Sequence, residues 1–313
     1  MNAHNIPNQF LEISSPDGRW HAQIAQQAAS LWTLSLNGEL LVEPPLIYPF
    51  VTTAGVTMAP WPNRLRDGVY ELNGKRYQAP INEERTNNAL HGLVMERHFN
   101  VSLHTETELR LHAAVGDDIA YPAGLEVGVN YELTNNGLLA TISGTNVSAN
   151  GESVGPIPFG TGPHPYFVTK PGSTLSVKST FSHQLDERQL PVGEQAPDLK
   201  GLPSGVPVQL RNLSIDDCFG GLSIEEDGLA HTHLTRPDLE LNLDIWQERE
   251  YGYLMVFNLQ PEGSEDGFLA LEPQTCPANA FNSGEDLIWL EPGQSWSASW
   301  GVRAQAIVTG GAK

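Results

Sequence analysis

The stretch Leu239-Glu240-Leu241-Asn242-Leu243-Asp244-Ile245-Trp246 carries an aliphatic side chain at every second position up to Ile245. Successive side chains of a β-strand point to opposite faces, so this alternation predicts a strand with one face in a core and the other toward solvent or a cleft. Four further runs have the same period or a composition rich in strand-forming residues, namely 31–36, 125–133, 138–143 and 253–259. No long segment shows the 3.6-residue period of an amphipathic helix.

Turn signals separate these runs. The chain has 30 glycines and 23 prolines spread along its length, as many turns require. The clearest hairpin and turn signals are Asn37-Gly38, Asn73-Gly74, Asn136-Gly137 and Pro16-Asp17-Gly18. Residues 186–206 are expected to form a long ordered excursion. The sequence shows no internal repeat and no linker, so we predict one all-β domain over residues 1–313, with large antiparallel sheets and few short helices.

The excess of acidic residues argues against some classes of binding partner. With 17 Lys and Arg against 37 Asp and Glu, the net charge is −20. This argues against nucleic acid or an anionic membrane as partner, because both are bound by basic surfaces. The sequence shows neither a signal peptide nor a membrane-spanning apolar stretch, so a cytoplasmic location is expected. The two cysteines, Cys218 and Cys276, do not suggest a disulfide framework and are expected to be buried.

The run Gly160-Thr161-Gly162-Pro163-His164-Pro165-Tyr166-Phe167 holds a histidine between two prolines. Each proline fixes its own φ and disfavours helical geometry in the residue before it, so the backbone around His164 is stiff and extended. The unperturbed pKa of histidine lies closest to neutrality, which suits a rigidly held one to proton transfer. The alternative is a histidine that is simply packed in a loop.

A candidate base lies in Leu269-Ala270-Leu271-Glu272-Pro273-Gln274-Thr275. Glu272 follows a short apolar run, and a carboxylate at the end of a buried strand is a candidate for a raised pKa and a general-base role. A buried ion pair is the alternative.

Three shorter segments hold further polar candidates, and those of Arg64 and Asp216 suit sugar hydroxyls but also have a structural alternative. Arg64 follows Asn63 in a proline-rich loop and would otherwise form a salt bridge. His91 precedes a glycine, which lets the backbone approach a neighbour closely. Asp216 and Asp217 form a carboxylate pair that would otherwise cap a turn.

His231 and His233 would share one face of a strand, where Asp238 or Glu240 could join them as metal ligands. The spacing matches no trusted metal-binding pattern, and no cysteine pair supports it. No metal is therefore expected.

Taken in order, these segments resemble the aldose 1-epimerase (galactose mutarotase) family. The matching stretches are PWPNRLRDGVYELNGKRYQAPINEERTNNALHG from Pro60 to Gly92, GPHPYF from Gly162, DDCF from Asp216 and LEPQT from Leu271, within about residues 20–303. The resemblance implies an all-β, antiparallel β-supersandwich of the galactose mutarotase-like type, with the site on one face.

The resemblance also implies roles. His164 would be the general acid that protonates the ring oxygen, and Glu272 the general base that takes the proton from the C1 hydroxyl. The residues that would bind the sugar are Asn63, Arg64, His91 and Asp216. The family often has a histidine where this chain has Asp217, so Asp217 is an alternative to Asp216. The segment LVMERHF after Gly92 also departs from the galactose-specific pattern.

Opening a hemiacetal needs one proton delivered to the ring oxygen and one removed from O1, which two groups with separated pKa values can perform. No cofactor is expected, and the partner is a small sugar whose identity the residues do not reveal. A hexose 6-phosphate epimerase, a non-catalytic sugar-binding protein and a two-carboxylate glycosidase using Glu272 and Asp216 are the alternatives. The candidates for phosphate binding are Arg64, Arg66, Lys75, Arg76 and Arg85. The candidates for stacking on a sugar, each also expected in the core, are Trp61, Tyr166, Trp246 and Phe281.

Overall fold

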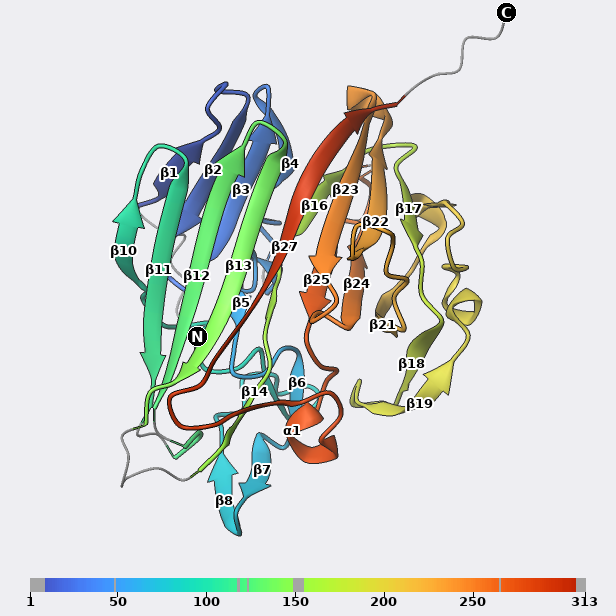
Figure 1. Cartoon of the computed structure of the whole chain (residues 1–313). Coiled ribbons are helices and arrows are strands. Elements are labelled where there is room, and N and C mark those ends of the chain that lie inside the picture. The colour runs from blue at the N-terminus through green and yellow to red at the C-terminus, as the bar shows by residue number, and fades with distance from the viewer. Residues whose placement is uncertain are drawn as a thin grey trace, which may run out of the picture.

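Two large antiparallel sheets dominate the chain (Figure 1). The computed structural model describes residues 9–47, 49–116, 119–122, 124–148, 155–264 and 266–307. The first sheet has ten strands, in the order β1 (Leu11–Ser14), β2 (Trp20–Ala25), β3 (Ser30–Leu36), β4 (Glu39–Val42), β16 (Tyr166–Thr169), β25 (Gly267–Gln274), β24 (Tyr253–Leu259), β21 (Asp216–Gly220), β18 (Phe181–Leu185) and β19 (Pro191–Gln195). The second has nine, in the order β10 (Asn100–His104), β11 (Glu108–Val115), β12 (Leu125–Thr134), β13 (Gly137–Asn146), β27 (Ser295–Ala306), β23 (Leu241–Glu248), β22 (Leu229–Arg236), β17 (Thr174–Val177) and β20 (Val208–Gln209).

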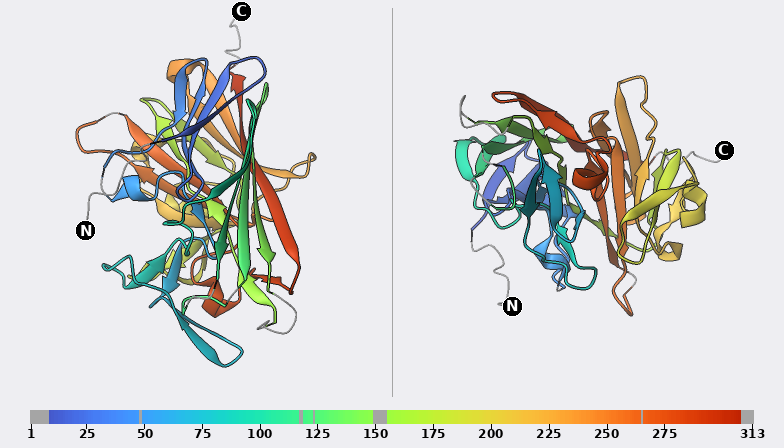
Figure 2. Two further views of the ribbon diagram at one scale, coloured as in Figure 1. Left: turned by 90° about the vertical axis from the view of Figure 1, so that its left-hand side faces the viewer. Right: turned by 90° about the horizontal axis from the view of Figure 1, so that it is seen from below.

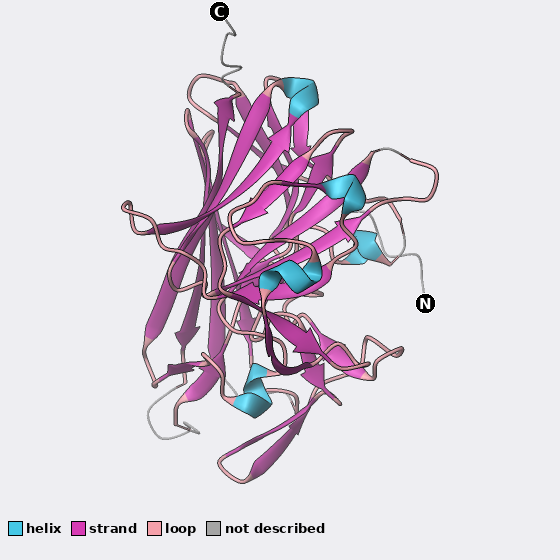
Figure 3. Cartoon of the chain, turned by 90° about the vertical axis from the view of Figure 1, so that its right-hand side faces the viewer, coloured by secondary structure: helices cyan, strands magenta, loops and turns pink. Residues whose placement is uncertain are grey.

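Smaller elements lie between and beyond these sheets (Figures 2 and 3). The two-stranded pairs are β5 (Thr57–Met58) with β15 (Gly162–Pro163), β6 (Arg64–Arg66) with β9 (Asn88–Leu90), β7 (Val69–Leu72) with β8 (Lys75–Gln78), and β14 (Ile157–Phe159) with β26 (Ile288–Leu290). The helical turns are α1 (Ala280–Ser283), η1 (Phe50–Thr52), η2 (Pro197–Lys200), η3 (Leu210–Asn212) and η4 (Pro237–Leu239). They lie in connections between strands (Figure 3). Among the described residues, no helix is long and apolar enough to cross a membrane.

The main core lies between the two large sheets. Leu271 of β25 and Val256 of β24, on the first sheet, and Ile245 of β23, on the second, belong to one cluster of buried apolar residues. Because side chains alternate along a strand, Ala270 and Glu272 of β25 point to the opposite face of the first sheet, away from this core. The segment between β4 and β5 packs against Ala270 on that face, and both Ala270 and Glu272 are buried. The first sheet therefore presents two buried faces, one apolar and one bearing polar groups.

The prediction of an all-β chain with large antiparallel sheets is confirmed, and each predicted Asn-Gly pair connects two neighbouring strands. The predicted strand over 239–246 begins two residues late. Leu239 belongs to η4, and Glu240 has a left-handed φ of 55°, so β23 starts at Leu241. The excursion over 186–206 is ordered and contains β19 and η2.

Candidate functional site

The loop-covered face of the first sheet brings the two principal candidates together. Tyr166 of β16 is paired with Ala270 of β25, and Glu272 lies two residues further along β25. His164 lies two residues before Tyr166, so antiparallel pairing carries it to the side of Glu272. Residues 108 positions apart in the sequence thus become neighbours.

The backbone of His164 is fixed by more than its two prolines. Its N–H donates to the carbonyl of Val56 over 3.0 Å, and its carbonyl accepts from the N–H of Gly55 over 2.8 Å. Gly162 lets this segment lie against β25, because a Cβ there would come within 2.4 Å of the carbonyl oxygen of Pro273. The segment therefore holds His164 in one place next to Glu272.

His164 and Glu272 form a close, buried pair. His164 Nε2 lies 3.2 Å from Glu272 Oε1, and the side chains are 6% and 3% exposed. The side-chain amide of Gln274 donates to Glu272 Oε2 over 3.0 Å. Burial raises the pKa of Glu272 well above its ordinary value, a shift that the nearby Asp216 reinforces. Burial lowers the pKa of His164 to about 4. Both shifts disfavour the charged forms, so a fully ionised pair of imidazolium and carboxylate is not the favoured state of these buried groups.

His91 packs edge-on against His164, with ring centroids 5.1 Å apart. It has a left-handed φ of 63°, and its N–H donates to the carbonyl of Asn63 over 2.8 Å. Burial, reinforced by His164, lowers the pKa of His91 well below its ordinary value, so its ring is neutral. The close approach predicted at Gly92 is present, because a Cβ there would lie 2.1 Å from the carbonyl oxygen of Ala59.

Arg64 is held by a carboxylate as well as by Asn63. Its Nε and Nη2 donate to the two oxygens of Glu83 over 2.9 and 2.8 Å, and its Nη1 donates to Asn63 Oδ1 over 3.2 Å. Glu83 also accepts from the hydroxyl of Thr86 and from the amide of Asn88. Burial acts to raise the pKa of Glu83, but the hydrogen bonds from Arg64, Thr86 and Asn88 and the charge of Arg64 together hold it below its ordinary value. The structural alternative for Arg64, a salt bridge, is therefore present within the candidate site.

Asp216 rather than Asp217 lies on the face that carries Glu272. Asp216 begins β21, in register with Phe257 and, through it, Ala270. Burial raises the pKa of Asp216, although Arg64 opposes the shift. Asp217 points to the other side, where it lies 2.6 Å from Lys200 Nζ.

Two neighbours of these groups, Glu83 and Gln189, were not singled out from the sequence. Glu83 holds Arg64, and the amide Nε2 of Gln189 donates to Asp216 Oδ2 over 3.2 Å. Glu83 lies inside the quoted motif between Pro60 and Gly92, but Gln189 lies in a turn that no motif marks.

Of the five basic residues that could bind a phosphate, Arg64 belongs to the candidate site, but the other four do not gather around it. Arg66 lies 3.6 Å from Asp186, and Lys75 lies over the ring of Tyr77. Lys75 and Arg76 belong to the separate β7–β8 hairpin, whereas Arg85 is exposed beside Gln189.

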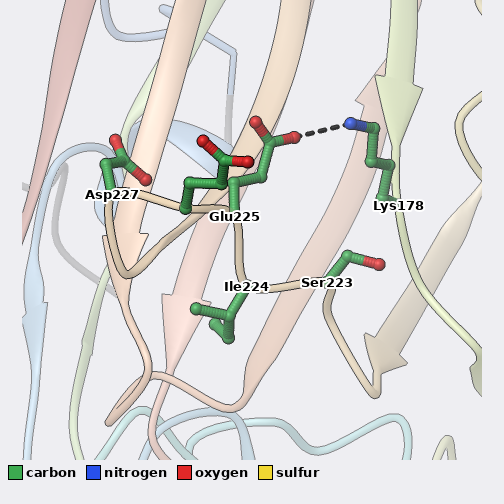
Figure 4. Close-up of a pocket in the computed structure, with 6 residues that line it drawn as sticks. Lys178, Ser223, Ile224, Glu225 and Asp227 are labelled. Atoms are coloured by element: carbon green, nitrogen blue, oxygen red, sulfur yellow. Dashed lines mark hydrogen bonds and ion pairs between the residues drawn. The ribbon is translucent and has the colours of Figure 1, made fainter.

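The remaining candidates lie elsewhere. His231 and His233 do share a face, but His231 is occupied by Asp244 at 2.8 Å and Asp227 at 3.2 Å. Among the described residues, no three His, Cys, Asp or Glu side chains are arranged to hold a metal. Both cysteines are free and buried. A surface pocket beside the Lys178–Glu225 ion pair contains none of the predicted site residues (Figure 4).

Of the four aromatic residues considered for stacking, only Tyr166 lies against the pair. Its ring centroid is 5.0 Å from that of His164. Trp61 and Phe281 pack against each other in the main core. Trp246 lies in β23 of the second sheet, beneath the guanidinium of Arg303.

Comparisons with known proteins identify the family and agree with the fold. The family model described as aldose 1-epimerase matches residues 10–303. The uncharacterized protein YihR of Escherichia coli K12 is 30% identical over 305 residues, covering 94% of this chain and 93% of that protein. A solved GalM/aldose epimerase homologue from C. elegans has a TM-score of 0.80 at 18% identity and covers 96% of this chain and 99% of its own. A galactose mutarotase-like protein from Clostridium acetobutylicum has a TM-score of 0.78 at 21% identity, with coverage of 92% and 93%.

Proposed function

The chain belongs to the aldose 1-epimerase family, and from this premise we propose that it interconverts the α and β anomers of a free aldose. The observation that carries the proposal is the pair of His164 and Glu272, 3.2 Å apart in a buried setting. Ring opening requires one proton to be given and one to be taken, and an adjacent acid and base are suited to both.

His164 is proposed to protonate the ring oxygen while Glu272 takes the proton from the C1 hydroxyl. The C1–ring-oxygen bond breaks as the C1–O1 double bond forms, and rotation about C1–C2 presents the other face of the aldehyde. Closure reverses the proton transfers. The lowered pKa makes the protonated form of His164 a strong acid, and the raised pKa makes the ionised form of Glu272 a strong base. Burial disfavours both forms, so the sugar is proposed to react with the form of the pair in which the proton is on His164.

The sugar is proposed to be held by the groups around this pair, which are Asn63, Arg64, His91 and Asp216. Arg64 offers a guanidinium fixed by Glu83, and Asp216 offers a carboxylate to hydroxyls. Neutral His91, in contact with His164, adds no positive charge that would oppose protonation of His164.

Polarimetry on freshly dissolved α-D-glucose and α-D-galactose tests the proposal. The protein is expected to accelerate relaxation to the uncatalysed endpoint. His164→Ala and Glu272→Gln should each lower kcat by at least about 100-fold, since a proton-transfer group contributes about 10²–10⁴-fold. His112→Ala, on β11 of the second sheet, is the matched control.

The same assay separates the alternatives. Acceleration only with glucose 6-phosphate would indicate the phosphosugar epimerase, and release of an aryl leaving group from an aryl glycoside would indicate a glycosidase. If a folded protein binds sugars without accelerating mutarotation of any aldose tested, it is a binding protein on this fold and the proposal is wrong.

A further inference from the structure

The turn between β18 and β19 is fastened to the loop that carries Glu83. Arg188 donates from Nε to the carbonyl of Thr86 over 2.9 Å and from Nη2 to the carbonyl of Asn87 over 2.8 Å. In return, the side-chain amide of Asn88 donates to the carbonyl of Arg188 over 3.1 Å. Segments about a hundred residues apart are thus locked together next to Arg64 and Asp216.

The residue after this clamp, Gln189, has a backbone conformation that non-glycine residues seldom adopt. Its φ is 59°, in the left-handed region. Its N–H donates to the carbonyl of Asp186 over 2.9 Å, which closes the turn. A long polar side chain at such a position suggests that the side chain, rather than the backbone, is what the position requires.

The side chain of Gln189 connects an exposed arginine, Arg85, to Asp216 of the candidate site. Its Oε1 accepts from Nη2 of exposed Arg85 over 3.3 Å, and its Nε2 donates to Oδ2 of half-buried Asp216 over 3.2 Å. Asp216 in turn lies near buried Glu272 and reinforces the upward shift of its pKa. Arg85 is exposed, Gln189 and Asp216 are half-buried, and Glu272 is buried.

The two partners also fix the orientation of the amide. Because Arg85 donates to the oxygen, the nitrogen must face Asp216, where one of its two N–H groups is used. Within the described part of the chain, the second N–H makes no hydrogen bond, and Asp216 Oδ1 accepts none. A donor and an acceptor are thus available side by side, which is the arrangement that a hydroxyl group satisfies with both its oxygen and its hydrogen.

We propose that Gln189 is a specificity-determining residue that, together with Asp216, recognises one hydroxyl of the sugar other than the anomeric one. This inference rests on the proposed function, because it assumes that the anomeric centre lies at His164 and Glu272. Arg85 acts as a positioning residue that keeps the amide nitrogen toward Asp216.

The test compares KM and kcat for the preferred aldose and for its analogues that lack one non-anomeric hydroxyl each. Gln189→Ala should raise KM for the parent sugar about three- to tenfold, as expected for one hydrogen bond, and change kcat by less than about twofold. For one deoxy analogue, KM should be the same in wild type and variant, because the partner hydroxyl is missing. Arg85→Ala should give a smaller rise in KM with the same pattern across the analogues.

Gln184→Ala is the matched control, since Gln184 is an exposed glutamine on β18 of the same hairpin. An unchanged KM in Gln189→Ala, or a rise by the same factor for every analogue, would overturn the specificity role while leaving the mutarotase proposal intact. An inactive wild-type protein would instead contradict the proposed function itself.

Discussion

Lowering the pH tests how many protons His164 and Glu272 hold together in the active protein. The proposed chemistry needs one proton on His164 and Glu272 together, and activity should fall when a second one binds. Burial lowers the pKa of His164 to about 4 from its ordinary 6.5, and this pKa governs the second proton because that of Glu272 is raised. Burial therefore acts against charging the imidazole in the folded protein.

The lowered pKa of His164 and the ordinary value of histidine predict very different activities at pH 5. With a pKa near 4, about nine-tenths of the protein keeps the one-proton pair, whereas with a pKa of 6.5 only about one molecule in thirty would. The assay is kcat/KM by polarimetry from pH 3.5 to 8, corrected for uncatalysed mutarotation, because kcat/KM reports the free enzyme. An acid limb near pH 6.5 would refute the reasoning.

Circular dichroism must accompany this titration. The folded-state pKa of His164 lies below its unfolded value, so the folded state binds fewer protons between about pH 4 and 6.5, and its stability falls as the pH is lowered through that window. A loss of activity counts against the account only where the protein remains folded.

Two further predictions concern stability. Glu272→Gln should raise the melting temperature at neutral pH. Burial raises the folded-state pKa of Glu272, so the wild type loses about 1.4 kcal/mol of stability per pH unit between the unfolded-state and the folded-state pKa. If the difference in melting temperature between variant and wild type does not widen with pH, this prediction is wrong. Gly162→Ala should destabilise the fold by about 1–3 kcal/mol in urea unfolding and lower kcat, because the new Cβ would lie 2.4 Å from the carbonyl of Pro273. Gly252→Ala, where a Cβ meets nothing within 4 Å, is the control, and equal effects in the two variants would refute the steric argument.

Much of the fold could be predicted because its signals are local. Each Asn-Gly pair favours a tight turn, and alternation along the neighbouring runs indicates strands with two distinct faces. The start of β23 could not be predicted from alternation, since Leu239 continues the apolar pattern. The 3₁₀ turn after Arg236 and the left-handed Glu240 interrupt the strand there, and these are features of backbone geometry.

The candidate site was only partly predictable for a related reason. His164 and Glu272 stand out by their immediate neighbours, but their contact depends on the register between β16 and β25. The choice between Asp216 and Asp217 depends on which face of the sheet each side chain occupies. A shift of one residue in the register exchanges the two faces, so the sequence alone does not settle it. Gln189 carries no local signal at all, because its importance arises from a turn clamped to a loop about a hundred residues away.

The measurement that tests the central claim most directly is anomer exchange at equilibrium, followed by two-dimensional exchange NMR of the anomeric protons. No net reaction occurs in this experiment, so exchange between the α and β signals reports ring opening and closure alone. Wild-type protein is expected to produce cross-peaks with at least one aldose, and both His164→Ala and Glu272→Gln are expected to abolish them while remaining folded. Undiminished exchange in either folded variant, or its absence with wild type across glucose, galactose and the pentoses, would contradict the account.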